Sequence, residues 1–172
     1  MSGEHQPFQR VAYSGDRVKD YGLLVEQARS LWEDDLPLAS NLANLSALLS
    51  QFLDRANWVG FYLWDERASH LVVGPFQGLP ACTRIPLGKG VCGTAVKTRS
   101  TQRVADVHLF PGHIACDSDS QSEIVVPLIR TGGEILGVLD IDSPVRDRFD
   151  AVDQEGLEGF AAALVDLWPP NR

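Results

Sequence analysis

The sequence predicts an α+β domain in which helices pack on one face of an antiparallel β-sheet and a loop-lined ligand pocket lies on the other. Two observations predict this class. Segments in which apolar residues recur at helical spacing lie near both ends of the chain, and segments with the alternation of β-strands lie between them. The chain has 172 residues, 44% of them hydrophobic and 22% charged, which suits one domain with its own core.

Three helices are expected on the covered face. Apolar residues at helical spacing indicate a helix over residues 16–32, and a second helix begins at Pro37 and reaches residue 52. The last helix begins near Asp150, a good N-cap with Asp153 three residues later. The first two helices are expected to pack as a pair that serves as scaffold or dimer contact.

Six segments have the composition of β-strands, at residues 58–64, 70–76, 84–87, 101–104, 123–130 and 134–142. A short helix over about residues 91–97 separates the third strand from the fourth. Residues 105–121 then form a long polar connection, and a connection of this length within a compact domain usually carries function. We expect residues 1–15 to be a flexible N-terminal arm and residues 16–172 to form a single domain.

Composition excludes several classes of function. The formal net charge is −8 and there is no basic patch, so nucleic-acid binding is not expected. No run of about 18 apolar residues and no apolar N-terminal segment is present, so neither a membrane span nor a signal peptide is predicted. The three cysteines match neither a disulfide-stapled module nor a CxxC zinc site, which favours the reducing cytoplasm.

Three acidic residues are expected to share one face of the sheet. Asp140 and Asp142 are two residues apart on one strand, and Glu123 begins the preceding strand. If the hairpin between these strands turns on an even number of residues, Glu123 joins the two aspartates; an odd number sends it to the face of Leu139 and Ile141. The even loop keeps the apolar residues together, so we predict the shared face.

Clustered carboxylates at this place indicate a functional site. Like charges close together raise the pKa of at least one of the groups, and such arrangements are common at active sites. The alternative is that these acids extend into solvent at the end of a strand. A metal site at these residues would have only three oxygen donors, because the sequence spacing places no histidine near them. No metal is therefore expected.

The settings of the cysteines suggest thiol chemistry. Cys116 lies in the polar connection and Cys82 follows a Gly-Leu-Pro turn, so both are expected to be accessible. Cys92, near a helix start, looks partly structural, although a helix N-terminus also lowers the pKa of a thiol. Two loop thiols with a third in reach resemble an attacking and resolving pair, in which a sulfenic acid is captured as a disulfide.

Five segments together identify a family resemblance: NWVGFYL (57–63), GPFQG (74–78), RIPLGKGVCGTA (84–95), CD at 116 followed by SEIVVPL (122–128), and GVLDIDS (137–143). They resemble the free methionine-(R)-sulfoxide reductases, which are built on a GAF domain, and the likeness covers roughly residues 18 to 167. Signalling GAF domains share the fold and the Gly-Val-Leu strand, but not these three cysteines with the Asp-Ile-Asp end.

The resemblance implies a reaction and roles for the cysteines. The family reduces the R-epimer of free methionine sulfoxide and not sulfoxide within proteins. By position, Cys116 resembles the nucleophile that becomes a sulfenic acid, and Cys82 the resolving thiol that forms a Cys82–Cys116 disulfide, which thioredoxin reduces. Cys92 resembles a secondary thiol or an alternative nucleophile. The family requires no cofactor and tends to form homodimers.

The expected sulfoxide site draws on further residues. Attack at sulfur needs the sulfoxide oxygen protonated, which Glu123, Asp140 or Asp142 could do, and the same acids could bind the substrate ammonium. The residues expected to bind the rest of the substrate are Trp58 and Tyr62 at its methyl-thio end and the backbone N–H groups of Gly90, Val91 and Cys92 at its carboxylate.

Two other functions are weighed against the reductase. One is a non-catalytic GAF domain that binds a small metabolite, a cyclic nucleotide or a chromophore. The other is a peroxide-reducing thiol enzyme, which would be active without any sulfoxide. Neither explains Glu123, Asp140 and Asp142 together as well as the reductase does.

Overall fold

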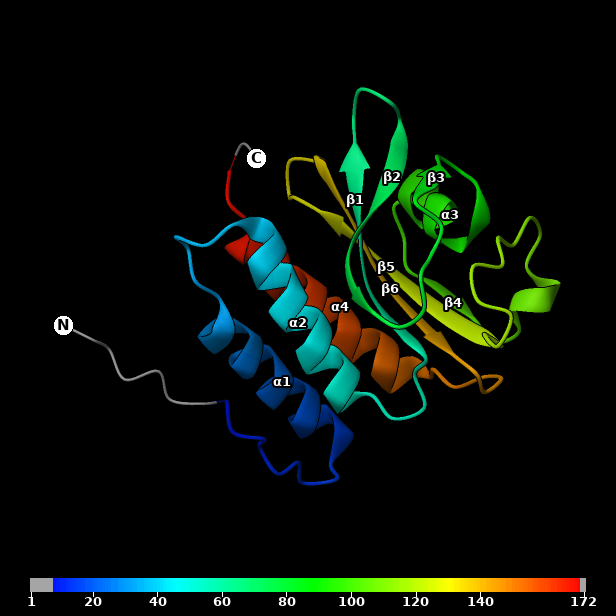
Figure 1. Ribbon diagram of the computed structural model, residues 1–172. Helices are drawn as coiled ribbons and strands as arrows, with labels where there is room; N and C mark the ends of the chain where they lie inside the picture. The colour runs from blue at the N-terminus through cyan, green and yellow to red at the C-terminus, as the bar shows by residue number, and fades with distance from the viewer. Residues whose placement is uncertain (1–7, 171–172) are drawn as a thin grey trace.

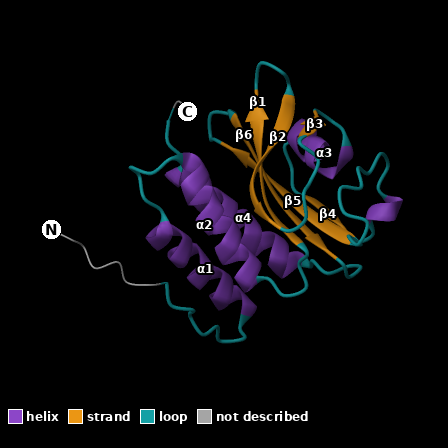
Figure 2. Cartoon of the chain, in the orientation of Figure 1, coloured by secondary structure: helices purple, strands orange, loops and turns teal. Residues whose placement is uncertain are grey.

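The computed structural model describes residues 8–170 (Figures 1 and 2). Met1–Pro7, the first part of the predicted arm, and Asn171–Arg172 lie outside the described residues. The elements in chain order are α1 (Arg17–Leu31), α2 (Leu38–Phe52), β1 (Trp58–Asp65), β2 (His70–Gln77), β3 (Arg84–Pro86), α3 (Gly90–Thr98), β4 (Gln102–Val104), the 3₁₀ turn η1 (Val107–Leu109), β5 (Ser122–Ile129), β6 (Ile135–Ser143) and α4 (Ala151–Leu167).

The predicted α+β architecture is confirmed. The strands form one sheet in the order β3-β2-β1-β6-β5-β4, and every neighbouring pair is antiparallel. Helices α1, α2 and α4 lie side by side over one face of this sheet, whereas α3 and the 105–121 connection lie over the other (Figures 1 and 2). Helix α3 therefore helps to enclose the pocket face, where the sequence predicted loops.

Alternation along the strands produces two separate hydrophobic cores. On the helix side, Phe61 and Leu139 are completely buried and belong to the same cluster as Leu24 of α1, Leu49 of α2 and Leu157 of α4. Burying one such side chain contributes about 1.5–3 kcal/mol to stability. On the opposite side the sheet packs against α3; the buried members there are Trp58, Tyr62, Leu71, Ile85, Val91, Cys92, Ala95, Val96, Val125 and Val138.

The end of the predicted arm is attached to the helical layer. The Ser14 and Gly15 backbone N–H groups donate to the two carboxylate oxygens of Asp20, at 2.8 and 2.9 Å. The Tyr13 ring packs edge-on against Phe52, with ring centroids 4.9 Å apart. The domain boundary at residue 16 stays a prediction. No helix within residues 8–170 is long and apolar enough to cross a membrane.

The predicted start of the last helix is confirmed. Asp150 is the N-cap of α4 and exchanges side-chain-to-backbone hydrogen bonds with Asp153, a capping box. The buried Asp153 carboxylate also accepts a hydrogen bond from the Tyr21 hydroxyl at 2.8 Å. This bond fixes the Tyr21 ring directly over Gly156, where an added Cβ would lie 2.2 Å from the ring.

We predict that Gly156→Ala destabilises the protein by about 1–3 kcal/mol, because the new methyl group collides with a buried, hydrogen-bonded ring. Urea unfolding followed by circular dichroism measures this change.

The matched control is Gly159→Ala in the same helix, where an added Cβ meets nothing within 4 Å. Alanine's higher helix propensity should stabilise this variant by about 0.5–1 kcal/mol. Equal effects of the two substitutions would contradict the assigned contact between α1 and α4.

Candidate active site

The pairing of β5 with β6 brings the three predicted acidic residues to one face. Glu123 lies opposite Asp142, and Val125 lies opposite Asp140, so all three carboxylates point to the pocket side of the sheet. The hairpin reaches this register indirectly. Ile129 pairs with Ile135, and an odd number of residues lies between them. A register shift between Leu128 and Ile129 then gives the remaining pairs the alignment predicted for an even loop, with Glu123 on the face of the two aspartates.

These acids do not extend into solvent, so that alternative is wrong. Glu123 and Asp140 are only 6% and 5% exposed, and Asp142 is half-buried. Burial raises the pKa of all three carboxyl groups because it disfavours the charged form. The negative charge of Asp140 further raises the pKa values of Glu123 and Asp142. The raised pKa values mean that the cluster retains protons at a pH at which exposed carboxyl groups are already ionised.

A disulfide joins Cys82 to Cys116, the pair that the family resemblance implied. Their Cα atoms are 5.7 Å apart, although 34 positions separate them in the sequence. The bond ties the β2–β3 connection to the 105–121 connection at the edge of the carboxylate cluster. Cys116 is exposed and Cys82 is half-buried, so the predicted accessibility holds fully for Cys116 and in part for Cys82.

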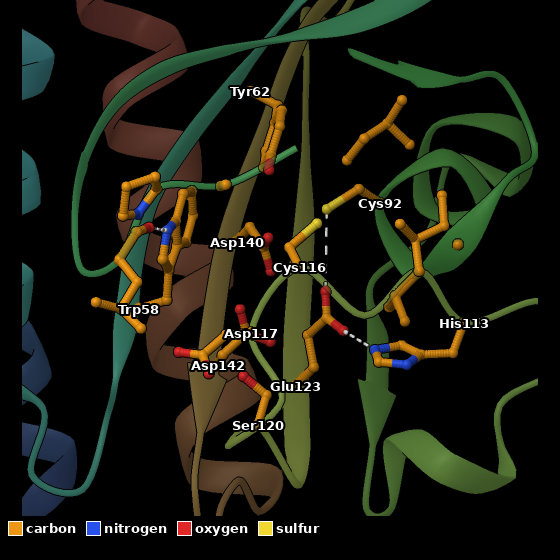
Figure 3. Close-up of a pocket in the computed structure, with 17 residues that line it drawn as sticks. Trp58, Tyr62, Cys92, His113, Cys116, Asp117, Ser120, Glu123, Asp140 and Asp142 are labelled. Carbon is orange, nitrogen blue, oxygen red and sulfur yellow. Dashed lines mark hydrogen bonds and ion pairs between the residues drawn. The ribbon is translucent and has the colours of Figure 1, made fainter. Parts of the chain in front are cut away.

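Cys92 lies in the first turn of α3 and is a free, buried thiol. Its Sγ is 4.0 Å from Glu123 Oε1 (Figure 3). Burial raises the pKa of this thiol, and the charges of Asp140 and Glu123 raise it further. The expectation that the helix N-terminus lowers this pKa is therefore wrong in net effect, because burial and two carboxylates outweigh the helix dipole.

Aromatic side chains form one wall of the site. Trp58 and Tyr62 are buried on the pocket face of β1, and their rings stack with centroids 5.7 Å apart. Phe76 of β2 also stacks with Trp58, with ring centroids 4.9 Å apart. The indole N–H of Trp58 donates to the Leu79 carbonyl at 3.1 Å, which fixes the orientation of the ring.

The start of α3 faces the same space. Gly90, Val91 and Cys92 form the first turn, where backbone N–H groups have no partner within the helix. Gly90 has a φ of +59°, and an added Cβ would lie 3.2 Å from the Ile114 side chain, so both backbone shape and space favour glycine there.

The 105–121 connection supplies pocket residues that the sequence analysis missed. His113 places its Nε2 3.8 Å from Glu123 Oε2, and burial lowers the pKa of its imidazole. Asn57 Nδ2 donates to Asp117 Oδ2 at 3.0 Å and to Ser120 Oγ at 3.2 Å, which holds the end of the connection against β1. The length and polarity of the segment marked it as functional, but no periodicity in a loop shows which side chains point inward.

These residues enclose one small cavity. The side chains drawn in Figure 3 line it, from the Trp58 wall to the His113 side, and Cys116 is among them. The cavity holds about 30 Å³, room for one or two water molecules.

Comparisons with known proteins agree with this geometry. The family model described as GAF domain matches residues 42–167. Free methionine-R-sulfoxide reductase from Escherichia coli is 48% identical, covering 87% of this chain and 88% of that protein. The enzyme of the same name from Saccharomyces cerevisiae is 50% identical, covering 90% and 89%. A Neisseria meningitidis free methionine-R-sulfoxide reductase, solved in complex with its substrate, is 43% identical with a TM-score of 0.86, covering 92% and 94%.

The fold, with a pocket on the face of the sheet opposite α1, α2 and α4, defines a GAF domain. Within that class, the identities over most of both chains show that this chain belongs to the free methionine-R-sulfoxide reductase family.

We predict that the reduced protein reacts with limiting iodoacetamide at Cys116 at least about tenfold faster than at Cys92. Exposure favours alkylation of Cys116, whereas burial and the raised pKa protect Cys92. Peptide mass spectrometry after brief labelling measures the ratio. Equal labelling of the two thiols would contradict the buried, protonated state assigned to Cys92.

Proposed function

We propose that this protein reduces free L-methionine (R)-S-oxide to methionine, with thioredoxin as the reductant. The observation that carries the proposal is the Cys82–Cys116 disulfide at the edge of a pocket lined by three carboxyl groups. The names of the E. coli and S. cerevisiae relatives support the choice of substrate.

The proposed reaction uses two thiols in sequence. The Cys116 thiolate attacks the sulfoxide sulfur while the sulfoxide oxygen takes up a proton. The resulting hydroxyl group is transferred to the Cys116 sulfur as the S–O bond and the transient bond between the two sulfur atoms break, so methionine leaves and Cys116 becomes a sulfenic acid. The Cys82 thiolate then attacks the Cys116 sulfur and releases water, which forms the disulfide. Thioredoxin transfers two electrons and two protons to that disulfide and restores both thiols.

Glu123 is proposed as the proton donor to the sulfoxide oxygen. It is almost fully buried, and its raised pKa keeps it protonated where an ordinary carboxyl group would be ionised. Asp140 and Asp142 are proposed to bind the substrate ammonium, and the half-buried Asp142 lies nearer to solvent. Cys92 is proposed as a secondary thiol, since burial makes it a poor first nucleophile.

The remaining contacts would select the free amino acid. Trp58 and Tyr62 are proposed to pack against the methyl-thio end, and the backbone N–H groups of Gly90, Val91 and Cys92 to bind the carboxylate. Recognition of both a free ammonium and a free carboxylate excludes a residue inside a peptide chain.

The setting of the protein is also proposed. Dependence on free thiols and on thioredoxin suits the cytoplasm, and the family likeness favours a homodimer. The non-catalytic GAF reading is less well supported, because a ligand-binding role does not need a disulfide at the edge of the pocket.

We predict NADPH consumption with thioredoxin and thioredoxin reductase when free methionine (R)-sulfoxide is added. The S-epimer and a peptide-bound sulfoxide, assayed in parallel, should give none. Cys116→Ser should abolish turnover because it removes the nucleophile.

Three other results of this assay would favour a different assignment. Turnover that survives Cys116→Ser and is lost in Cys92→Ser would overturn the cysteine assignment but keep the enzyme. Turnover with peroxide alone would favour a peroxide-reducing thiol enzyme. No turnover with any of these substrates would favour the non-catalytic reading.

We predict that Glu123→Gln lowers kcat about 10²- to 10⁴-fold, because glutamine keeps the shape but cannot donate the proton. The coupled assay at saturating sulfoxide measures this. Glu134→Gln is the matched control: it makes the same change at an exposed position of the same hairpin and should retain full activity. An active Glu123→Gln enzyme would assign the proton to another group.

A further inference from the structure

The pocket contains a set of metal donors of mixed type. The Cys92 Sγ, one carboxylate oxygen of Glu123 and one of Asp140 all lie within 4.8 Å of one another, and all three residues are buried. Within residues 8–170 this is the one group of three such side chains whose donor atoms converge in this way. The three residues come from α3, β5 and β6, so no motif in the sequence reveals the set.

A second observation points to a cation at the same place. Asp140 is only 5% exposed, and its buried Oδ1 has no hydrogen-bond partner among residues 8–170. Buried carboxylate oxygens are normally paired with a donor or a metal ion. Figure 3 shows the side chains of Asp140, Cys92 and Glu123 in the same part of the pocket, with that of Cys116 drawn beside them.

We propose that Cys92, Glu123 and Asp140 bind a zinc ion. A thiolate with two carboxylates is a donor set that zinc accepts and that magnesium and calcium do not prefer, since those ions favour oxygen ligands alone. Zinc takes four ligands, and a water molecule supplies the fourth. Binding displaces to solvent the protons that the Cys92 thiol and the Glu123 carboxyl group otherwise hold.

The space suits an ion better than it suits a larger ligand. The cavity of about 30 Å³ accommodates a metal ion and one water molecule. Tetrahedral zinc bonds of about 2.0–2.3 Å place ligand atoms roughly 3.4–3.6 Å apart, so the donors must approach one another by about 1 Å. Cys92 Sγ and Glu123 Oε1, at 4.0 Å, already come close to that spacing.

His113 and Asp142 lie beside the donor set without belonging to it. His113 Nε2 approaches the other carboxylate oxygen of Glu123, at 3.8 Å, and can orient the carboxylate toward the ion. Asp142 lines the same cavity but is outside the converging group. Substitution of Asp142 therefore serves as a control for the general attraction between a metal ion and nearby negative charge.

Zinc in this position would occupy the space proposed for the sulfoxide. Zinc and methionine sulfoxide would then exclude each other, so that zinc acts as an inhibitor. This consequence rests on the proposed function, whereas the binding site itself does not.

The test is titration of the oxidised protein with Co²⁺, a spectroscopic substitute for zinc. Because Cys82 and Cys116 are joined, Cys92 is the free thiol among the three cysteines of the chain. A thiolate-to-cobalt charge-transfer band should therefore appear, saturate at one equivalent and disappear when Zn²⁺ is added. Cys92→Ser should lose the band while its circular dichroism spectrum stays native.

The carboxylates are tested by two equivalent substitutions. Asp140→Asn should weaken Co²⁺ binding at least tenfold, and Asp142→Asn should change it less than threefold. Three results would overturn the site: no band in the wild type, a band that survives Cys92→Ser, or equal weakening by Asp140→Asn and Asp142→Asn.

Mutual exclusion is tested in the Cys82→Ser/Cys116→Ser double variant, which keeps only the Cys92 thiol. Free methionine (R)-sulfoxide should reduce its Co²⁺ band, and an unchanged band in the presence of bound sulfoxide would contradict the inhibition. None of these readouts needs turnover. An active reductase without the band refutes only the metal site, and a band without reductase activity refutes only the proposed function.

Discussion

The alignment of Glu123 with Asp142 is the constraint on which the site depends. A slip of one residue between β5 and β6 would turn the acids into the core beneath α1, α2 and α4 and expose Leu139 and Ile141 to the pocket. Two hydrophobic cores, one on each face of the sheet, oppose that slip. The cost of burying three carboxyl groups is reduced because burial raises their pKa values and keeps protons on the cluster.

The disulfide connects the chemistry of the site with its size. Cys116 belongs to a connection whose end is held by Asn57 through Asp117 and Ser120, so both the disulfide and these hydrogen bonds restrain this end of the connection beside the cavity. With both in place the cavity holds only about 30 Å³. In the proposed mechanism, reduction of the disulfide frees the Cys116 thiol and therefore precedes each turnover.

Much of this arrangement could be predicted from local sequence patterns. Alternation in β6 placed Asp140 and Asp142 on one face, and the capping residues Asp150 and Asp153 marked the start of α4. The position of α3 on the pocket face, the environment of Cys92 and the approach of His113 to Glu123 depend on tertiary packing. Periodicity within one element does not contain that information, so the sequence could not show that burial and two neighbouring carboxylates raise the Cys92 pKa.

The central claim is that sulfoxide reduction and formation of the Cys82–Cys116 disulfide are one process. The most direct measurement is a single turnover: the protein is reduced, freed of reductant, mixed with excess free methionine (R)-sulfoxide and digested for peptide mass spectrometry. The account predicts one methionine formed for each Cys82–Cys116 disulfide, with Cys92 still a free thiol. Methionine formed without that disulfide, or a disulfide that includes Cys92 in its place, would contradict it.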